Sequence, residues 1–209
     1  MVRSLLFALT LLPFANTAVA DNETAIFAGG CFWCVESDFE KVQGVDEVVS
    51  GYTGGTTANP TYDTVKGSGH YEAAAITYDP DIVTYTQLLH AFFRSVDPTD
   101  AGGQFCDRGD SYRTAIFVSN PAERAAAETA KANAQRDLGQ RIVTPILDAA
   151  TFYDAEDYHQ DYYKGENRVI TRRGVKVQSD AYAFYRNACG RDARVLELWG
   201  DAAPFAHQN

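Results

Sequence analysis

The stretch TAIFAGGCFWCVE, residues 24–36, predicts how the fold begins. Its first half is a short apolar run that ends in two glycines, which is typical of a strand that ends in a turn. After the glycines, apolar side chains recur at helical spacing with polar residues between them: Phe32, Val35, Phe39 and Val42. The stretch therefore predicts a strand that passes directly into a helix, with Cys31 at the helix N-terminus.

Further along, predicted strands alternate with predicted helices. Residues 45–55 have the pattern of a strand that runs into a glycine turn, and residues 71–80 that of a strand closed by Pro80. Two more strand patterns occur at residues 114–119 and 142–149. A helix over residues 84–96 begins with a capping box of Thr84 and Gln87, and a second helix over 121–138 has Asn120 as its cap and Gly139 as its stop. We expect one α+β domain, a two-layer sandwich with a mixed sheet and a ferredoxin-like core, followed by a long irregular C-terminal segment from residue 154.

The N-terminal segment has the features of a secretory signal peptide. Arg3 precedes an apolar run over residues 5–14, and Ala18-Val19-Ala20 forms a small-x-small cleavage site. The apolar run is too short to span a bilayer. A buried N-terminal helix is the alternative, but the polar DNET follows the cleavage site abruptly. We expect a protein exported to the periplasm or secreted, with a mature domain over residues 21–209.

The mature chain would be strongly acidic. Without residues 1–20 it has 17 basic side chains, one fewer than the 18 of the whole chain, against 28 acidic ones, for a formal net charge of −11. Such a chain repels nucleic acid and anionic membranes, so we expect neither as a partner. We expect a monomer.

Four cysteines make the redox chemistry informative: Cys31, Cys34, Cys106 and Cys189. A pair of structural disulfides is one interpretation in an exported chain, although a domain of this size can build a core without them. Zinc is disfavoured because only one CxxC pair is present. A helix N-terminus stabilises an anion, so the placement of Cys31 predicts a lowered thiol pKa and a reactive thiolate.

Two further residues suggest a binding site. Trp33 lies about 140° around the helix from the centre of the apolar stripe, which favours ligand contact over packing under a loop. Glu72 shares a strand face with Ala74, Ile76 and Tyr78, so burial there would raise its pKa and make it a proton donor. The alternative is that Glu72 lies beyond the sheet edge and is solvated.

Six short motifs occur in one order along the chain: GCFWCVE (30–36), GYTGG (51–55), NPTY (59–62), GHYEA (69–73), DRGDSYR (107–113) and AEDYHQDYY (155–163). In this combination the sequence resembles the peptide methionine sulfoxide reductases of the A class. The resemblance implies thiol-dependent reduction of methionine S-sulfoxide, free or in proteins. It also implies that the site needs no metal, flavin or nucleotide cofactor.

The resemblance assigns roles to seven residues. The nucleophile of the family falls on Cys31, and its carboxylic acid falls on Glu72. The tyrosine of NPTY and the aspartate and tyrosine of DRGDSYR fall on Tyr62, Asp107 and Tyr112. The two aromatic residues around the substrate methyl group fall on Phe32 and Trp33. Acid and hydroxyl groups are wanted because the sulfoxide sulfur is weakly electrophilic until its oxygen is protonated or hydrogen-bonded.

The resolving thiol, which condenses with the resulting sulfenic acid, stays open. Many family members have glycine where this chain has Cys34, so we rank the candidates Cys34, then Cys189, then Cys106. A mobile C-terminal segment could deliver Cys189. A thioredoxin-like reductant would then restore the enzyme by thiol–disulfide exchange.

Two other functions compete with this one. A thioredoxin-like disulfide oxidoreductase could use the CxxC pair. A secreted, disulfide-stapled binding module would have no reactive thiol. The histidines lack metal-ligand spacing, and we expect His159 to be a hydrogen-bonded structural residue.

Overall fold

The computed structural model describes residues 21–206. The predicted signal peptide and its cleavage site lie outside the described residues. Within residues 21–206, no helix combines the length and the apolar character that a membrane crossing requires.

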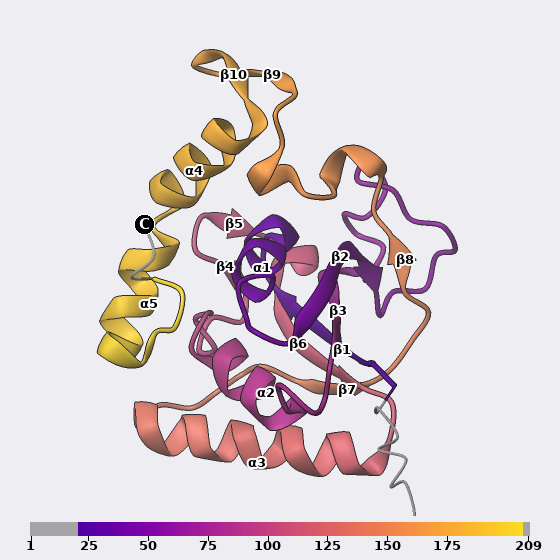
Figure 1. Ribbon diagram of the computed structural model, residues 1–209, viewed down its shortest axis with the longest axis vertical. Helices are drawn as coiled ribbons and strands as arrows, with labels where there is room; N and C mark the ends of the chain where they lie inside the picture. The colour runs from indigo at the N-terminus through magenta and orange to yellow at the C-terminus, as the bar shows by residue number, and fades with distance from the viewer. Residues whose placement is uncertain (1–20, 207–209) are drawn as a thin grey trace, which may run out of the picture.

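A six-stranded sheet forms the centre of the protein (Figure 1). Its strands, in the order in which they are hydrogen-bonded, are β7 (Ile146–Asp148), β6 (Thr114–Val118), β1 (Glu23–Gly29), β3 (Tyr71–Tyr78), β2 (Val45–Thr53) and β8 (Tyr153–Asp154). Only β6 and β7 pair in parallel, so the sheet is mixed as predicted. Helix α1 (Phe32–Phe39) joins β1 to β2, and α2 (Tyr85–Phe93) lies between β3 and β6 in the chain. This is the βαββαβ order of a ferredoxin-like core, which confirms the predicted topology.

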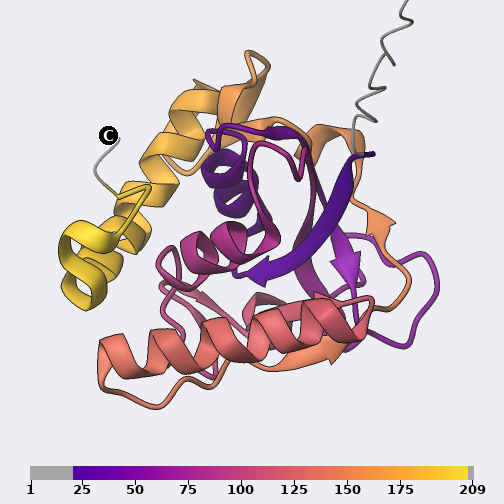
Figure 2. The same cartoon turned by 60° about the horizontal axis from the view of Figure 1, so that its bottom comes forward.

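The helices cover one face of the sheet. Figure 2 shows α2 and α3 (Pro121–Leu138) side by side on that face. The main core lies between these layers and includes Phe27, Phe39, Ile76, Leu88 and Phe92. A smaller cluster on the opposite face contains Ala28, Ala73, Ala115 and Phe117, with Phe152 packed against it. The architecture is therefore a two-layer sandwich whose second sheet face is covered by connecting segments.

The residues predicted to begin and end the helices do so in the structure. Thr84 and Gln87 form both hydrogen bonds of the capping box, and Asn120 caps α3 by accepting from the backbone N–H of Glu123. Gly139 ends α3 with a φ of 68°. Two boundaries were predicted too long: α2 ends at Phe93, and β7 contains only Ile146–Asp148. Pro145, which has no N–H, precedes β7 and limits its pairing.

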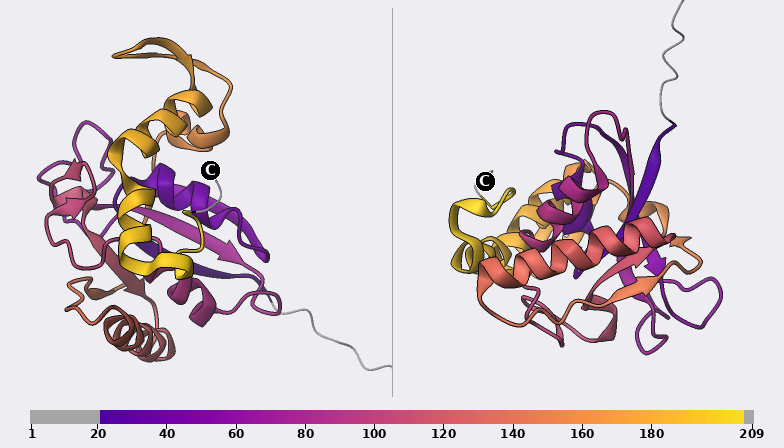
Figure 3. Two further views of the ribbon diagram at one scale, coloured as in Figure 1. Left: turned by 90° about the vertical axis from the view of Figure 1, so that its left-hand side faces the viewer. Right: turned by 90° about the horizontal axis from the view of Figure 1, so that it is seen from below.

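The prediction of an irregular C-terminal segment was wrong. This region forms a hairpin of β9 (Arg168–Thr171) and β10 (Gly174–Val177), followed by helices α4 (Gln178–Cys189) and α5 (Arg191–Trp199). Gly190, with a φ of 73°, separates the two helices. Figure 3 shows α4 and α5 following one another along one side of the molecule beside α1. Ala181 and Tyr182 of α4 pack against Cys34 of α1, so this segment completes the region around the CxxC pair.

Candidate active site

One cavity of about 310 Å³ collects every candidate site residue predicted from the sequence. Its lining contains Cys31, Phe32, Trp33, Cys34, Tyr62, Glu72, Cys106, Asp107, Tyr112 and Cys189. The N-terminus of α1 forms one wall. The opposite walls come from the segment of β4 (Gly103–Gln104), β5 (Asp107–Arg108) and the 3₁₀ turn η1 (Asp110–Tyr112), and from α4.

A tight glycine turn places Cys31 in this cavity. Gly30 has a φ of +84°, and a Cβ at this position would lie 2.6 Å from Cβ of Gln104. Both the backbone conformation and the close approach therefore require glycine. Cys31 follows as the N-cap of α1, and its carbonyl accepts from the backbone N–H of Cys34. The turn thus directs the thiol away from the C-terminal end of β1 and into the cavity.

The two thiols of the CxxC pair are free but not equivalent. The hydrogen bond with Cys34, together with burial, raises the pKa of Cys31 well above its ordinary value. The same hydrogen bond, helped by Arg191 and Arg186, lowers the pKa of Cys34 to about 7 despite its burial. The prediction of a lowered pKa at Cys31 was therefore wrong for this dithiol state. The negative charges of Glu72 and Asp107 oppose the effect of the helix N-terminus on Cys31.

Glu72 lies on the helix-covered face of β3, with 1% of its surface exposed. The backbone N–H of Phe32 donates to its Oε2 atom at 3.2 Å, and Oε1 has no hydrogen-bond partner among the described residues. Burial raises the pKa of this carboxyl to about 8, and the nearby charge of Asp107 acts in the same direction. The solvated alternative is excluded. Glu72 is a protonated acid near neutral pH with one oxygen left for a ligand.

Two tyrosines and an aspartate complete the polar side of the cavity. The hydroxyl of Tyr112 interacts with the side chains of both Glu72 and Tyr62, and burial raises the pKa of both phenols. Glu156 holds the loop that carries Tyr62 by accepting from its backbone N–H at 3.0 Å. Burial also raises the pKa of Asp107, while Arg191 opposes this shift. With the Glu72 carboxyl and the hydroxyls of Tyr62 and Tyr112, the cavity therefore offers three proton donors around the Cys31 thiol.

The apolar wall is built from stacked rings. Trp33 is half-buried and stacks on Tyr162, with ring centroids 3.8 Å apart and planes 6° apart. Phe32 is buried behind it against Tyr52 and His159. Trp33 lies outside the main core, as its position on the helix predicted, but it also packs on the 3₁₀ turn η3 (Tyr162–Lys164). Trp33 therefore lines the cavity and also packs on this turn.

His159 differs from the prediction. Its ring is 2% exposed and lies among aromatic side chains, 4.8 Å from the ring centroid of Tyr62 and 5.5 Å from that of Trp33. Neither ring nitrogen has a hydrogen-bond partner among the described residues, so the expected hydrogen-bonded role was wrong. Burial lowers the pKa of His159 to about 4. The neutral imidazole packs behind the apolar wall as an aromatic ring.

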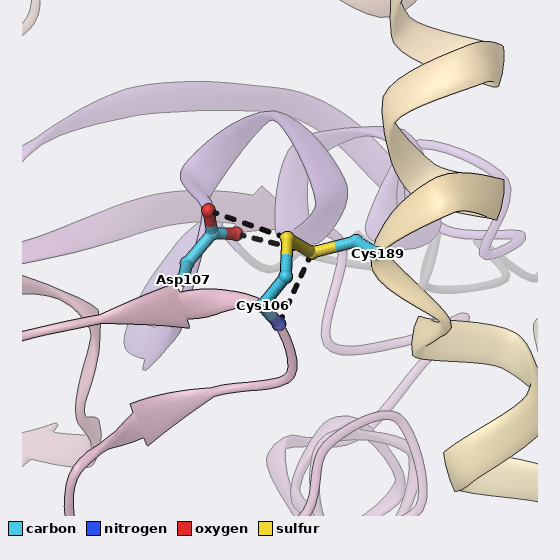
Figure 4. Close-up of side chains that lie close together, drawn as sticks. All are labelled: Cys106, Asp107 and Cys189. Atoms are coloured by element: carbon cyan, nitrogen blue, oxygen red, sulfur yellow. Dashed lines mark hydrogen bonds between the residues drawn. A yellow bond between two sulfur atoms is a disulfide. The ribbon is translucent and has the colours of Figure 1, made fainter.

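The remaining two cysteines are bonded to each other. Cys106 and Cys189 form a disulfide at the cavity edge, and Figure 4 shows the carboxylate of Asp107 beside it. Oδ2 of Asp107 lies 3.8 Å from the sulfur of Cys189, and the backbone N–H of Cys106 donates to that sulfur at 3.2 Å. In this state neither residue offers a thiol, and Cys189 is tied down instead of being delivered by a mobile tail. Only Cys34 remains as a free thiol beside Cys31.

A model of the peptide methionine sulfoxide reductase family matches residues 23–191. The chain belongs to this family. It is 47% identical to peptide methionine sulfoxide reductase MsrA 2 of Rhizobium meliloti, over 94% of this chain and 93% of the relative. It is 50% identical to the MsrA 2 of Caulobacter vibrioides, over 93% and 96% of the two chains. The solved methionine sulfoxide reductase A of Corynebacterium diphtheriae superposes with a TM-score of 0.62 at 32% identity, covering 68% of this chain and 74% of that one.

Other residues line the cavity of this peptide methionine sulfoxide reductase without having been predicted: Phe105, Tyr162, Tyr182, Tyr185, Arg186 and Arg191. Tyr162 lies within the AEDYHQDYY motif, so the motif contained a signal that was not assigned to one residue. The residues of α4 and α5 had no such signal, because only the packing of this segment against α1 brings them to the site.

Proposed function

We propose that this peptide methionine sulfoxide reductase acts on methionine S-sulfoxide and that Cys31 is its nucleophile. One observation carries the proposal: a thiol, a protonated carboxyl and two phenol hydroxyls face one cavity that has an aromatic wall. The residues in these roles are Cys31, Glu72, Tyr62, Tyr112, Phe32 and Trp33. The arrangement suits a ligand with one polar S–O group and one small apolar group.

The first step transfers the oxygen to Cys31. Near neutral pH the two thiols of the CxxC pair share one proton, and Cys31 attacks as the thiolate when that proton lies on Cys34. The sulfur of Cys31 forms a bond to the sulfoxide unit as Glu72 donates its proton to the oxygen. The sulfoxide S–O bond breaks, and Cys31 becomes a sulfenic acid while methionine and the Glu72 carboxylate are produced. Tyr62 and Tyr112 hydrogen-bond the oxygen as negative charge develops on it.

The second step forms a disulfide within the motif. The sulfur of Cys34 attacks the sulfenic sulfur of Cys31, the S–O bond breaks, and the departing hydroxide takes up a proton to become water. A CxxC pair at a helix start forms such a bond with little backbone movement. We propose Cys34 for this role because Cys106 and Cys189 are already bonded to each other. A thioredoxin-like external dithiol then reduces the Cys31–Cys34 disulfide by exchange.

The proposal extends to the surroundings of the enzyme. We propose that residues 1–20 direct the chain to the periplasm or outside the cell, and that the mature protein works as a monomer on oxidised proteins or free methionine sulfoxide. The side chains of the cavity supply both the nucleophile and the acid, so the chemistry as proposed requires no cofactor. The electrons come from thiols throughout.

The competing functions fit the site less well. A thioredoxin-like oxidoreductase attacks with an exposed, low-pKa first cysteine, whereas here the pKa of Cys31 is raised and that of Cys34 is lowered. A stapled binding module has no use for two free thiols at the floor of a cavity. Neither function explains a buried, protonated Glu72.

Turnover of the two epimers of a blocked methionine sulfoxide, with dithiothreitol as reductant, tests the proposal. We expect activity on the S epimer only, none in Cys31→Ser, and a sharp loss in Glu72→Ala. Full activity in Cys31→Ser would disprove the mechanism, and equal turnover of both epimers would reject the stereochemical assignment. Insulin reduction at a comparable rate would favour the disulfide oxidoreductase.

A further inference from the structure

The C-terminal helices bring two buried arginines to the cavity. Arg186 comes from the last turn of α4 and Arg191 from the first turn of α5, and their exposed fractions are 6% and 2%. Both line the cavity that contains Cys31 and Cys34. Buried guanidinium groups are costly unless they are paired, so their surroundings show what they act on.

The two arginines share one buried carboxylate. Nη1 of Arg186 donates to Oδ1 of Asp38 at 2.7 Å and to the hydroxyl of Tyr182 at 3.0 Å. Arg191 donates to two backbone carbonyls, and its Nε lies 3.9 Å from Oδ2 of Asp38. Neither that Nε nor that Oδ2 has a hydrogen-bond partner among the described residues. Asp192, which is partly exposed, accepts three further hydrogen bonds from Nε and Nη2 of Arg186.

The disulfide fastens the junction that carries both arginines. Cys189 is three residues after Arg186 and two before Arg191, and its bond to Cys106 joins the α4–α5 junction to the segment that carries Asp107 (Figure 4). Gly190 follows in the left-handed region and leaves the junction little covalent restraint of its own. Cys106 is exposed and Cys189 is half-buried, so the bond lies at the rim of the cavity.

We propose that Arg186 and Arg191 are positioning residues that stabilise the thiolate of Cys34 as it attacks the sulfenic acid, and that the Cys106–Cys189 disulfide holds them in place. The proposal rests on the proposed function, because it concerns the second step of that reaction. The Cys106–Cys189 bond is then a structural disulfide and takes no part in electron transfer.

The second step is where the arginines matter most. In the dithiol state the largest influence that lowers the pKa of Cys34 is the hydrogen bond from Cys31. Once Cys31 carries oxygen, that thiol donor is gone, and the arginines are the remaining groups that favour the thiolate. The titratable and charged groups that act on Cys34 or on its partners come from α1 and the residues after it, β3, β5, α4 and α5: Cys31, Asp38, Lys41, Glu72, Asp107, Tyr182, Arg186, Arg191 and Asp192. Three of these groups are cations: Lys41 acts on Asp38, and the two arginines act on Cys34 itself.

Charge removal tests the arginines. We compare Arg191→Gln and Arg186→Gln with the charge-retaining Arg191→Lys and Arg186→Lys, and follow loss of the dimedone-reactive sulfenic acid after one turnover. Each Gln variant should form the Cys31–Cys34 disulfide about tenfold more slowly at pH 7 and recover at higher pH, because one unit of pKa changes the thiolate fraction tenfold. The Lys variants should retain most of the rate. Unchanged rates and pH midpoints in both Gln variants would overturn the proposal.

Two controls separate this step from the first one. In a Cys34→Ser background, which stops after one methionine, Arg186→Gln should release that methionine within about twofold of the background rate, because Arg186 is not among the largest influences on the Cys31 pKa. Arg191→Gln does not serve in this control, because Arg191 also acts on Asp107. Arg194→Gln is the matched control on α5: Arg194 pairs with Asp97 and Glu197 and does not line the cavity. It should leave disulfide formation unchanged. If Arg186→Gln slows the first methionine as much as the disulfide step, the assignment is wrong.

A measurement in a single-thiol background isolates the charge of the arginines. In Cys31→Ala, thiolate absorbance at 240 nm reports Cys34 without its thiol neighbour, where burial raises its pKa and the arginines lower it. Adding Arg191→Gln should raise the midpoint, whereas adding Arg191→Lys should leave it nearly unchanged. An equal midpoint with and without Arg191→Gln would show that Arg191 does not stabilise the thiolate.

The disulfide is tested with a Cys106→Ser, Cys189→Ser double variant. Disulfide formation should slow and shift to higher pH as in the Gln variants, while a thioredoxin-type reductant still recycles the Cys31–Cys34 bond. A wild-type rate of disulfide formation would show that the bond holds nothing in place. The alternative outcome is an oxidised Cys31–Cys34 pair that accumulates because the reductant cannot reduce it. That result would show that Cys106 and Cys189 pass electrons to the pair, and it would overturn the structural role proposed for their disulfide.

Discussion

The backbone N–H of Phe32 donates a hydrogen bond to Oε2 of Glu72 at 3.2 Å, which ties the first turn of the nucleophile's helix to the buried acid on the neighbouring strand. The residue that directly follows Cys31 therefore positions the group that would protonate the sulfoxide oxygen. Because Oε2 is occupied, the unpartnered Oε1 is left as the proton donor. This hydrogen bond between α1 and β3 fixes the acid beside the helix of the nucleophile.

The pKa of Glu72 predicts the alkaline limit of the first step. The acid is protonated below its pKa of about 8, so methionine release in a single turnover should fall as pH rises through that value. Glu72→Gln should lose this dependence and Glu72→Ala should be about 10²- to 10⁴-fold slower, the range for a general acid. Rapid-quench measurements between pH 6 and 10 check both. An unchanged alkaline limb in Glu72→Gln would assign it to another group.

The same burial should cost stability at high pH. The folded-state pKa of Glu72 is raised, so unfolding gains an ionised carboxylate once the pH exceeds the unfolded value near 4.3, and the penalty grows until about pH 8. Glu72→Gln should therefore raise the Tm more at pH 9 than at pH 4, with a difference in unfolding free energy of roughly 5 kcal/mol. Thermal unfolding at the two pH values measures this. Equal shifts would mean that Glu72 is ionised in the folded protein.

His159 should produce the opposite dependence in acid. Its folded-state pKa of about 4 lies below the ordinary value of 6.5, so the unfolded chain binds a proton first and stability falls as pH drops from about 6.5 to 4. His159→Phe keeps an aromatic ring behind Trp33 and removes the titrating group. The Tm of this variant should drop less between pH 7 and pH 4.5 than that of the unaltered protein. Parallel Tm profiles would contradict a neutral imidazole at position 159 in the folded protein.

The stacked pair Trp33 and Tyr162 should set the size of the accepted alkyl group. Trp33→Ala should lower kcat/KM for the methyl sulfoxide by about ten- to a hundredfold, because an apolar contact of this size contributes roughly 1–3 kcal/mol. The loss should be smaller for an ethyl sulfoxide, which fills part of the space. Tyr162→Phe retains the ring stacking and should lose much less. Equal losses for both substrates would place the methyl group elsewhere.

The turn before Cys31 can be tested with a matched pair of glycines. Gly30→Ala combines a positive φ with an approach of 2.6 Å to Gln104, whereas Gly67, with a φ of +78°, has nothing within 4 Å. Gly67→Ala should cost about 1 kcal/mol for its backbone conformation alone. Gly30→Ala should cost about 1–3 kcal/mol more from overpacking and should also reduce activity. Chemical unfolding and turnover measure both effects, and equal stability losses would show that the close approach is not limiting.

Local signals predicted much of this fold. The capping box of Thr84 and Gln87 and the alternation along β3 depend on neighbours within a few residues, so they could be read without the tertiary structure. The pairing of Cys106 with Cys189 spans 83 residues and is one of several that the cysteines allow. The pKa order of Cys31 and Cys34 comes first from the hydrogen bond between the two thiols, and Arg191 and Arg186 add to it. The motif contains the two thiols, but these arginines reach the site only through helix packing, so their share could not be predicted from the motif.

Peptide mapping after a single turnover without reductant directly tests whether Cys31 is the nucleophile and Cys34 the resolving thiol. With methionine S-sulfoxide, we expect one methionine released per protein molecule, a new disulfide between Cys31 and Cys34, and an unchanged Cys106–Cys189 disulfide. With the R epimer the thiols should remain free. Methionine release with Cys31 still reduced, or a new bond from Cys31 to Cys106 or Cys189, would contradict these roles.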